Sequence, residues 1–432
     1  MKRVGLLSAL SLLSAFLLSC GYTAPRSGSS GGSGLKFRAF VSQAISASTA
    51  APGLDIVDAS RDLLVSAPGI SIAGTPGMME VSGNKTVTLV FDSTTNAVNV
   101  ISNKQESESG RVVLPSWTQS MAITPDATVA YVAVPNAPVA GGPSGAVEMI
   151  NVSSLDVQNT IPVTSAHYLV LSPDSTHLLV FSDNSDSATL INFQNVGSTS
   201  SPSWVMNGPP IPISGFNRPV WATFSSDSNT AYVMNCGPEC GGTAGPASVS
   251  ALTVGTGTIA QTLPLPSGGA TYGVLFGNTL YVAGNPPIAN PSPCSPTTVN
   301  TCGVLSVLTV NNGTLQLANS VSIPDGDHRR MAVTADNQVF VGSTGCTNVD
   351  VPGNPPTTFG CLAVYNPKNA QSAIIGTDLG DVTGIAPVTG RTEVYVVQNG
   401  ELRIWDTVQD ALRPGQNQID IIGQAVDVKI AD

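Results

Sequence analysis

The sequence has little charge, and the charge that it has is mostly acidic. Only 10% of the 432 residues are charged, with 17 Lys and Arg against 28 Asp and Glu. No run of Lys or Arg would form a basic groove for phosphates, so we expect no nucleic acid partner. Disordered chains are poor in hydrophobic residues, whereas 42% of this chain is hydrophobic, so most of it should fold.

Helical periodicity is also missing from most of the chain. After the first twenty residues there is no amphipathic segment of about 20 residues, which excludes a largely helical fold. The length alone suggests two or three domains, although large all-β folds often run longer as one. The repeats described below decide between these possibilities.

The one long apolar run lies at the N-terminus. It spans residues 4–19, follows Lys2 and Arg3, and is short for a membrane span, which needs about 20 residues. It fits the apolar region of a secretory signal. The segment 17–20, LLSC, resembles the lipobox of bacterial lipoproteins, so we expect residues 1–19 to be a signal peptide and Cys20 to be lipidated. An ordinary signal peptide with a chance cysteine is the alternative.

The resemblance to lipoproteins also implies a location. Gly21 rather than Asp follows the cysteine, which by similarity to enterobacterial sorting rules favours the outer membrane. Residues 20–35 are then the lipidated cysteine and a flexible Gly/Ser tether. Residues 36–432 form a single folded domain, held in the bacterial cell envelope on its periplasmic or surface face.

An internal repeat dominates this domain. MAITPD (121–126) precedes VAYVAV, LVLSPD (169–174) precedes HLLVFSD, ATFSSD (222–227) precedes TAYVMN, and MAVTAD (331–336) precedes QVFVGS. Weaker copies cover 79–84, 273–278 and 385–390. Each copy is an apolar strand, a polar turn and an alternating strand, and most units continue with two more strands. Four strands per unit of roughly 40–50 residues predict the blades of a β-propeller.

The two ends of the domain complement each other. The C-terminal DVKIAD (427–432) matches the first strand of the repeat, whereas FRAFVSQA (37–44) looks like a second strand that lacks a first. We therefore expect the C-terminal strand to join the N-terminal blade and close the propeller, which leaves no large exposed sheet edge. Eight four-stranded blades are favoured; seven are the alternative if the copy at 385–390 is misread.

The repeat resembles the YVTN-type propeller repeat, in which SPDG precedes a YVAN-like strand. The glycine is missing here, and Ala127, Ser175, Ser228 and Asn337 take its place. The resemblance covers nearly all of residues 36–432 and implies the propeller fold. It also implies lactonase-like relatives, because sugar-lactone hydrolases use similar repeats.

Six cysteines besides Cys20 fall into three local pairs. We expect three disulfides, because the pairs recur in the same loop of successive blades and an exported compartment permits oxidation. The pairs are Cys236–Cys240, Cys294–Cys302 and Cys346–Cys361. A zinc site is the alternative, but no histidine lies in these loops, so we expect no metal. A redox motif has two residues between its cysteines, and here the shortest spacing has three.

Polar residues collect just before the first strands, at the expected central mouth of the propeller. The candidate ligand-binding residues are His167, Tyr168, Arg218, Tyr272, Asp327, His328, Arg329 and Arg330. Arginine suits carboxylate and phosphate because its donors form a planar fork. The alternative is structural, since polar residues at such connections often satisfy neighbouring backbone groups.

Two functions remain open from these observations. The first is a membrane-anchored binding module, monomeric and without cofactor, that recognises a glycan, an acidic small molecule or a protein. The second is a lactonase-like hydrolase in which His167, His328 or Arg330 acts on a sugar lactone. No nucleophile context is recognisable, so the first is favoured and enzymatic activity is not expected.

Overall fold

The computed structural model describes residues 32–44, 53–65, 69–72, 74–286, 302–348, 357–368, 373–376 and 378–432. The predicted signal peptide, Cys20, the tether up to residue 31 and Cys294 lie outside the described residues. Among the residues that are described, no helix has the length and apolarity to cross a membrane.

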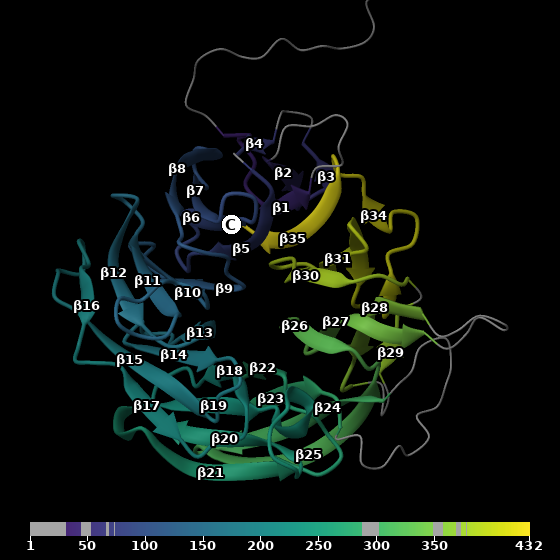
Figure 1. Ribbon diagram of the computed structural model, residues 1–432. Helices are drawn as coiled ribbons and strands as arrows, with labels where there is room; N and C mark the ends of the chain where they lie inside the picture. Colours follow the sequence, from purple (N-terminus) through teal and green to yellow (C-terminus); the bar gives the residue numbers. More distant parts are fainter. Residues whose placement is uncertain are drawn as a thin grey trace, which may run out of the picture.

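The described residues form eight antiparallel sheets arranged as blades in a ring (Figure 1). This confirms the predicted all-β propeller and decides for eight blades over seven. The copy at 385–390, which raised the doubt, is the hairpin of a blade of its own. We number the blades in chain order, with the N-terminal blade as blade 1.

The first four blades have the following strands. Blade 1 contains β1 (Arg38–Ala44), β2 (Gly53–Asp58), β3 (Leu63–Leu64), β4 (Ile70–Ser71) and β35 (Gln424–Ile430). Blade 2 contains β5 (Pro76–Val81), β6 (Val87–Asp92), β7 (Ala97–Ser102) and β8 (Ser107–Val113). Blade 3 contains β9 (Ser120–Ile123), β10 (Val129–Val134), β11 (Ala146–Asn151) and β12 (Asp156–Pro162). Blade 4 contains β13 (Ala166–Leu171), β14 (His177–Ser182), β15 (Ser187–Asn195), β16 (Trp204–Met206) and β17 (Ile211–Ser214).

The other four blades follow the same order. Blade 5 contains β18 (Pro219–Phe224), β19 (Thr230–Asn235), β20 (Ala247–Thr253) and β21 (Thr258–Leu265), with the short 3-10 helices η1 (Gly237–Cys240) and η2 (Val254–Thr256) between strands. Blade 6 contains β22 (Tyr272–Phe276), β23 (Thr279–Gly284), β24 (Gly303–Asn311) and β25 (Thr314–Ile323). Blade 7 contains β26 (Asp327–Val333), β27 (Val339–Asn348), β28 (Thr357–Tyr365) and β29 (Ile374–Ile375). Blade 8 contains β30 (Val382–Pro387), β31 (Glu393–Gln398), β32 (Glu401–Asp406), β33 (Ala411–Leu412) and β34 (Gln418–Ile419).

Blade 1 is assembled from both ends of the domain. Strand β35 pairs antiparallel with β1, with Val41 opposite Val428 and Ser42 opposite Asp427. Strand β1 pairs on its other side with β2. The predicted pairing of the C-terminal strand with the strand near Phe37 is therefore observed, and Figure 1 shows the yellow β35 beside the purple β1.

The blades pack face to face through apolar side chains. Successive residues of β1 point to opposite faces, as the period of a strand requires. Val41 packs on Tyr395 of blade 8, whereas Phe40 packs on Met79 and Val90 of blade 2. Fully burying a side chain of this size stabilises the fold by about 1.5–3 kcal/mol, so both neighbours hold blade 1 in place.

An ionic network adds a polar link between blades 1 and 8. Asp62, which is 1% exposed, accepts hydrogen bonds of 2.8 Å each from Nη1 and Nη2 of Arg391. Arg413 and the hydroxyl of Tyr395 also donate to this carboxylate. Burial acts to raise the pKa of Asp62, but the bonds from Arg391 and Tyr395 outweigh it and hold the pKa below its usual value. The carboxylate therefore stays charged between the blades.

The turn after each first strand explains how the repeat tolerates the missing glycine. In blade 4, Asp174 accepts from the Ser172 hydroxyl at 2.6 Å and from the Thr176 amide at 3.0 Å. This side-chain turn forces the next residue into the left-handed region. The φ angles there are 64° at Ala127 and 63° at Ser175, so these positions retain the backbone of the glycine without its freedom.

Candidate functional site

Two disulfides in the described residues hold the hairpins between the second and third strands of blades 5 and 7. Cys236 and Cys240 form a disulfide across η1 in blade 5, and Cys346 and Cys361 join β27 to β28 in blade 7. These are two of the three predicted pairs. The third involves Cys294, outside the described residues, while Cys302 lies directly before β24.

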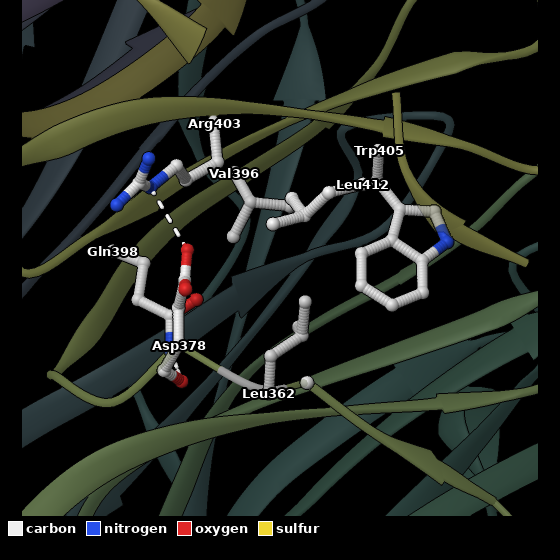
Figure 2. A pocket seen from close by; sticks show the side chains of 8 residues that line it. Leu362, Asp378, Val396, Gln398, Arg403, Trp405 and Leu412 are labelled. Carbon is white, nitrogen blue, oxygen red and sulfur yellow. Dashed lines mark hydrogen bonds and ion pairs between the residues drawn. The ribbon is translucent and has the colours of Figure 1, made fainter. Parts of the chain in front are cut away.

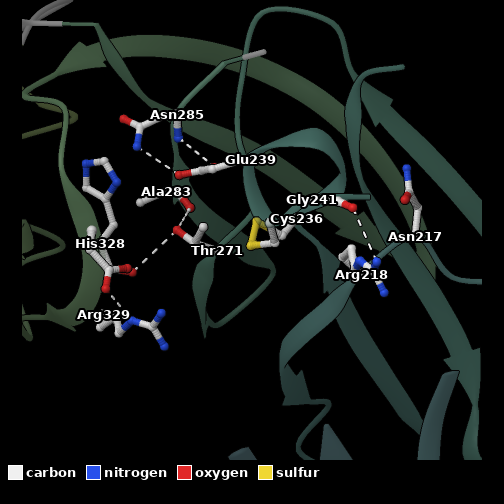
Figure 3. Close-up of a disulfide and its surroundings, with 12 residues drawn as sticks. Asn217, Arg218, Cys236, Glu239, Gly241, Thr271, Ala283, Asn285, His328 and Arg329 are labelled. Carbon is white, nitrogen blue, oxygen red and sulfur yellow. Dashed lines mark hydrogen bonds and ion pairs between the residues drawn. A yellow bond between two sulfur atoms is a disulfide. The ribbon is translucent and has the colours of Figure 1, made fainter. Parts of the chain in front are cut away.

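Hydrogen bonds connect these loops on one face of the ring. Both carboxylate oxygens of Glu239 accept hydrogen bonds from Asn285, one from its backbone N–H at 3.0 Å and one from its side-chain Nδ2 at 2.8 Å. Asn285 Nδ2 also donates to the carbonyl of Gly326 at 2.8 Å, and Asp325 accepts from the Thr347 amide at 2.8 Å. Figure 3 shows Glu239 and Asn285 beside the Cys236 disulfide. The loops of blades 5, 6 and 7 thus meet around the connection that leads into β26.

A second group of residues, the mouth cluster, lies at the start of the first strands on this face. It contains Trp117, His167, Tyr168, Asp327 and Arg329. The rings of His167 and Tyr168 stack with centroids 4.1 Å apart, and Trp117 meets His167 edge-on at 5.5 Å. The guanidinium of Arg329 lies 4.9 Å from the Tyr168 centroid and pairs with Asp327 at 2.5 Å.

The mouth cluster draws on blades that are not neighbours. Tyr168 belongs to β13 in blade 4, and Arg329 belongs to β26 in blade 7. A direct contact between them means that the innermost strands approach closely at this level. His167 is fixed from two sides, since Nδ1 lies 2.6 Å from Asp183 and Nε2 lies 2.9 Å from Gln119. A ligand at the mouth would therefore meet aromatic rings and a guanidinium together.

A third group, the axial cluster, lies further along the innermost strands. It contains Glu80, Tyr272, Arg330 and Lys429, which interact electrostatically across blades 1, 2, 6 and 7. Lys429 approaches Glu80 at 3.8 Å, and Tyr272 stacks on Trp221 at 4.6 Å. Burial raises the pKa of Tyr272, so its phenol stays protonated at neutral pH.

β-Bulges position the key side chains of both clusters. The register shifts by one residue between Ala166 and Tyr168, and again between His328 and Arg330. His167 and Arg329 are the extra residues at these bulges, which turn side chains out of the regular alternation. A third bulge, in β30, makes Thr383 the extra residue, and Arg330 Nε donates to its carbonyl at 2.7 Å. The bulges thus place two consecutive arginines on the inner surface.

His328 and Arg218 do not join these clusters. His328 is 1% exposed and its Nε2 lies 2.8 Å from the carbonyl of Pro324, so it fills the interior and does not face a ligand. Burial lowers its pKa to about 4, which leaves the ring neutral at pH 7. Arg218 donates to the carbonyl of Gly241 at 3.3 Å and approaches Asp186 at 3.8 Å, on the far side of the Cys236 disulfide (Figure 3). His328 therefore fits the structural alternative, in which a polar residue at a blade connection satisfies a neighbouring backbone group.

Two carboxyl groups near the mouth, those of Glu239 and Asp327, have raised pKa values. Burial raises the pKa of Glu239 to about 7, against the lowering effect of the bonds from Asn285, and nearby Asp327 adds to the rise. Burial also raises the pKa of Asp327, which Arg330 partly offsets. A carboxyl group with a pKa near the working pH can both take and give a proton.

Two of the cavities in the described part of the chain differ in kind. The first, of about 10 Å³, lies between blades 7 and 8 beside the ion pair of Asp378 with Arg403 and the indole of Trp405 (Figure 2). It has room for one water-sized molecule and for no larger ligand. The second is an open groove of about 510 Å³ between blades 3 and 4, and Asp183 at its wall links it to His167.

Comparisons with known proteins support the fold. No family model matches the chain, and none of the curated proteins matches its sequence. The dihydro-heme d1 dehydrogenase NirN in complex with DHE is similar in structure, with 13% identity and a TM-score of 0.55 over 91% of this chain and 75% of that one. Hydrazine synthase of Kuenenia stuttgartiensis is also similar, with 14% identity and a TM-score of 0.53 over 79% of this chain and 98% of that one.

A third similar structure is explicitly a propeller. The β-propeller domain of Cps50 (Swd1) from Myceliophteria thermophila has 10% identity and a TM-score of 0.53, over 78% of this chain and 97% of that one. At such low identity these likenesses show the fold and nothing about activity.

Sequence reasoning did not find several residues of the site. Glu80 and Lys429 are each the last but one residue of a strand, β5 and β35, far apart in the chain, and only the ring brings them together. Trp221 was not singled out, although it follows Arg218 at the start of β18. Glu239 lies between Cys236 and Cys240, and nothing in the local sequence marks it as a group with its own role. A signal for the bulge in β13 was present in the sequence, because two consecutive residues with polar groups, His167 and Tyr168, interrupt the alternation there, and both are half-buried.

Proposed function

We propose that the protein is a lipid-anchored binding module of the cell envelope that takes an anionic ligand at the mouth and axial clusters. The observation that carries this proposal is the state of Arg330. Its Nε and Nη1 donate to the carbonyls of Thr383 and Arg329, at 2.7 and 3.1 Å. Among the described residues it has no carboxylate within ion-pair distance. Asp327 and Glu80 act on Arg330 electrostatically but form no direct ion pair with it, so its fixed guanidinium is available to pair with an anion.

The neighbouring groups narrow the class of ligand. Arg329 stands next to Arg330, and two guanidinium groups together favour carboxylate or phosphate. Tyr168, His167 and Trp117 offer ring faces and edges beside them, and such rings bind flat or apolar faces of a ligand. The combination supports an acidic molecule that contains a ring.

A thermal-shift screen tests the proposal. The panel contains sugar acids, acidic metabolites, sugar phosphates, cell-wall fragments and a haem-type macrocycle, each with its neutral counterpart. We expect acidic members to raise the melting temperature of the unaltered protein and Arg330→Gln to remove the effect. Arg111→Gln is the matched control, because Arg111 is exposed on β8 and forms no ion pair in the described structure.

The outcome of the screen decides between the alternatives. Equal shifts with Arg330→Gln and with the unaltered protein would overturn the assignment of Arg330. No shift with any anion would overturn the proposal for small ligands and favour a protein partner.

The lipid anchor has its own test. Metabolic labelling with a radioactive fatty acid should mark the protein, and Cys20→Ser should abolish the label and release the domain from the membrane fraction. Release without loss of label would contradict the assignment of Cys20. Since stable attachment needs more than one acyl chain, the unaltered protein should resist extraction by salt.

A lactone hydrolase is the second candidate, and Glu239 is the observation that favours it. A carboxyl group held by two bonds from Asn285, with a pKa of about 7, suits a general base that activates water. His328 is too buried to take this role. Lactone turnover by the unaltered protein that falls at least a hundredfold in Glu239→Gln would establish the hydrolase, and absence of turnover across a lactone panel would exclude it.

A further inference from the structure

The groove between blades 3 and 4 continues outward from the mouth cluster. Its walls come from the connection between β12 and β13, the turn between β14 and β15, and the outer strand β17. Asp183 belongs to the groove wall, and its carboxylate lies 2.6 Å from Nδ1 of His167, which stacks on Tyr168. Through this contact the wall of the groove adjoins the mouth cluster.

The lining of the groove is hydroxyl- and amide-rich. Its side chains include Thr164, Asp183, Asn184 and Thr189, and Thr164 and Asn184 are exposed with no hydrogen bond to the rest of the described structure. Free donors and acceptors of both kinds along an open groove match a ligand with many hydroxyl groups. With about 510 Å³ the groove has room for several sugar rings or a short peptide.

The prolines of the groove argue against a peptide. Pro162 ends β12, the outermost strand of its blade, and Pro212 lies in β17, at the outer side of blade 4. Proline has no N–H to donate, so these edges pair poorly with an added peptide strand. A sugar chain needs no such ladder, because it is recognised through hydroxyl groups and through its ring faces.

From these observations we infer that the groove is an extended subsite for an acidic oligosaccharide. One acidic sugar ring lies at Arg329, Tyr168 and Trp117, and the following rings occupy the groove past Asp183. This inference rests on the proposed function, since it names the ligand class of the same mouth. It adds that affinity grows with chain length.

Calorimetric titration with galacturonate, trigalacturonate, hexagalacturonate and neutral maltohexaose tests the inference. We expect hexagalacturonate to bind the full-length protein at least tenfold more tightly than galacturonate, and maltohexaose to bind at least tenfold more weakly than hexagalacturonate. Thr164→Glu should weaken hexagalacturonate binding about three- to tenfold and Thr164→Lys should strengthen it by a similar factor, with little effect on the monomer. Ser267, exposed in the equivalent connection of blade 5 to blade 6, takes the same two substitutions as the matched control.

Each outcome separates this inference from the proposed function. If galacturonate and hexagalacturonate bind equally, or if Ser267 variants change hexamer binding more than Thr164 variants do, the groove is not the subsite, while the anionic mouth remains. If another anion of the thermal-shift panel binds and no uronate does, the inference of an oligosaccharide ligand fails, while the proposed function stands. If an acidic peptide binds and the sugars do not, the ligand class is wrong. If no anion binds and Arg330→Gln changes nothing, the proposed function itself fails.

Discussion

The guanidinium of Arg329 lies over the ring of Tyr168 at 4.9 Å, although the two residues belong to blades 7 and 4. Most contacts in a propeller join neighbouring blades, so this contact reports how closely the innermost strands approach one another. It also joins Arg329, the extra residue of one β-bulge, to Tyr168, which directly follows the extra residue of another.

A double-mutant cycle should measure this contact. Arg329→Gln and Tyr168→Leu should each destabilise the protein slightly, and the double variant should show a coupling energy of about 0.5–1 kcal/mol in urea unfolding, as expected for an exposed cation–π pair. Tyr168→Phe should retain most of the coupling. Arg329→Gln with Trp221→Leu serves as the control pair, because Trp221 contacts Tyr272 instead. Equal coupling in both pairs would contradict the contact.

Asp62→Asn should destabilise the junction of blades 1 and 8. The substitution removes one of the two carboxylates that Arg391 and Arg413 share and leaves them only Glu393, and their side chains are 23% and 30% exposed. We expect a loss of about 2–3 kcal/mol in the free energy of unfolding at pH 7, below the value for a fully buried pair because water reaches the arginines. The depressed pKa of Asp62 means that this contribution is present above about pH 4 and is lost on further acidification. Asp420→Asn, at an exposed site, should change stability by less than about 0.5 kcal/mol.

Ala127→Gly should stabilise the protein, although glycine usually weakens a fold. Ala127 has a φ of 64°, a conformation that costs an L-residue about 1–2 kcal/mol. The strain energy that is relieved exceeds the free-energy cost of the added conformational entropy of the unfolded chain. We therefore expect the free energy of unfolding, measured by chemical denaturation, to rise by about 0.5–1 kcal/mol. Asn337→Gly, at a φ of 75°, should gain less because asparagine tolerates this region. A loss of stability in Ala127→Gly would show that its methyl packing matters more.

The two described disulfides should differ in their contribution to stability. The Cys346–Cys361 bond spans 15 positions and the Cys236–Cys240 bond spans 4. In the chain-entropy model their removal costs about 3 and about 2 kcal/mol. Guanidinium unfolding of Cys346→Ala/Cys361→Ala and of Cys236→Ala/Cys240→Ala measures both. A larger loss for the short loop would show that the disulfide acts on the folded network of Glu239 and Asn285 rather than on the unfolded chain.

Glu239→Gln should become relatively more stable as the pH rises. The pKa of Glu239 is raised from 4.5 to about 7, so the folded protein holds this proton more tightly than the unfolded chain does. The carboxyl group therefore contributes stability at low pH that is lost as the pH rises through about 7. Between pH 5 and pH 8 the free energy of unfolding of Glu239→Gln should gain about 1–2 kcal/mol relative to the unaltered protein. A difference that does not vary with pH would contradict the raised pKa.

The architecture was predictable because local signals and the repeat agree. Turn aspartates such as Asp126 and Asp174 recur at blade spacing, and strands on each side alternate in the way that a blade requires. The same signals predicted that β35 would join β1. They also paired Cys236 with Cys240 and Cys346 with Cys361, and the structure bears out both disulfides, although Cys346 and Cys361 lie within β27 and β28 and not in a loop.

The site was less predictable, for physical reasons. Arg329 and Arg330 were found, but consecutive residues of a regular strand point to opposite faces, and only the bulge puts both on the inner surface. His328 shows the reverse case: it belongs to the same polar run, yet its side chain turns inward. Glu80 meets Lys429 because β5 of blade 2 lies beside β35 of blade 1, a contact between segments far apart in the chain that no local pattern contains.

The composite make-up of blade 1 has a consequence for biosynthesis. Strand β1 leaves the ribosome long before its neighbour β35, which follows only after the seven other blades have been translated. During that interval β1 offers a bare hydrogen-bonding edge, the kind of surface to which chaperones and other nascent chains attach. A message truncated shortly before codon 424 would yield seven finished blades and one permanently open edge. Proteolytic surveillance could therefore recognise incomplete copies by that edge alone.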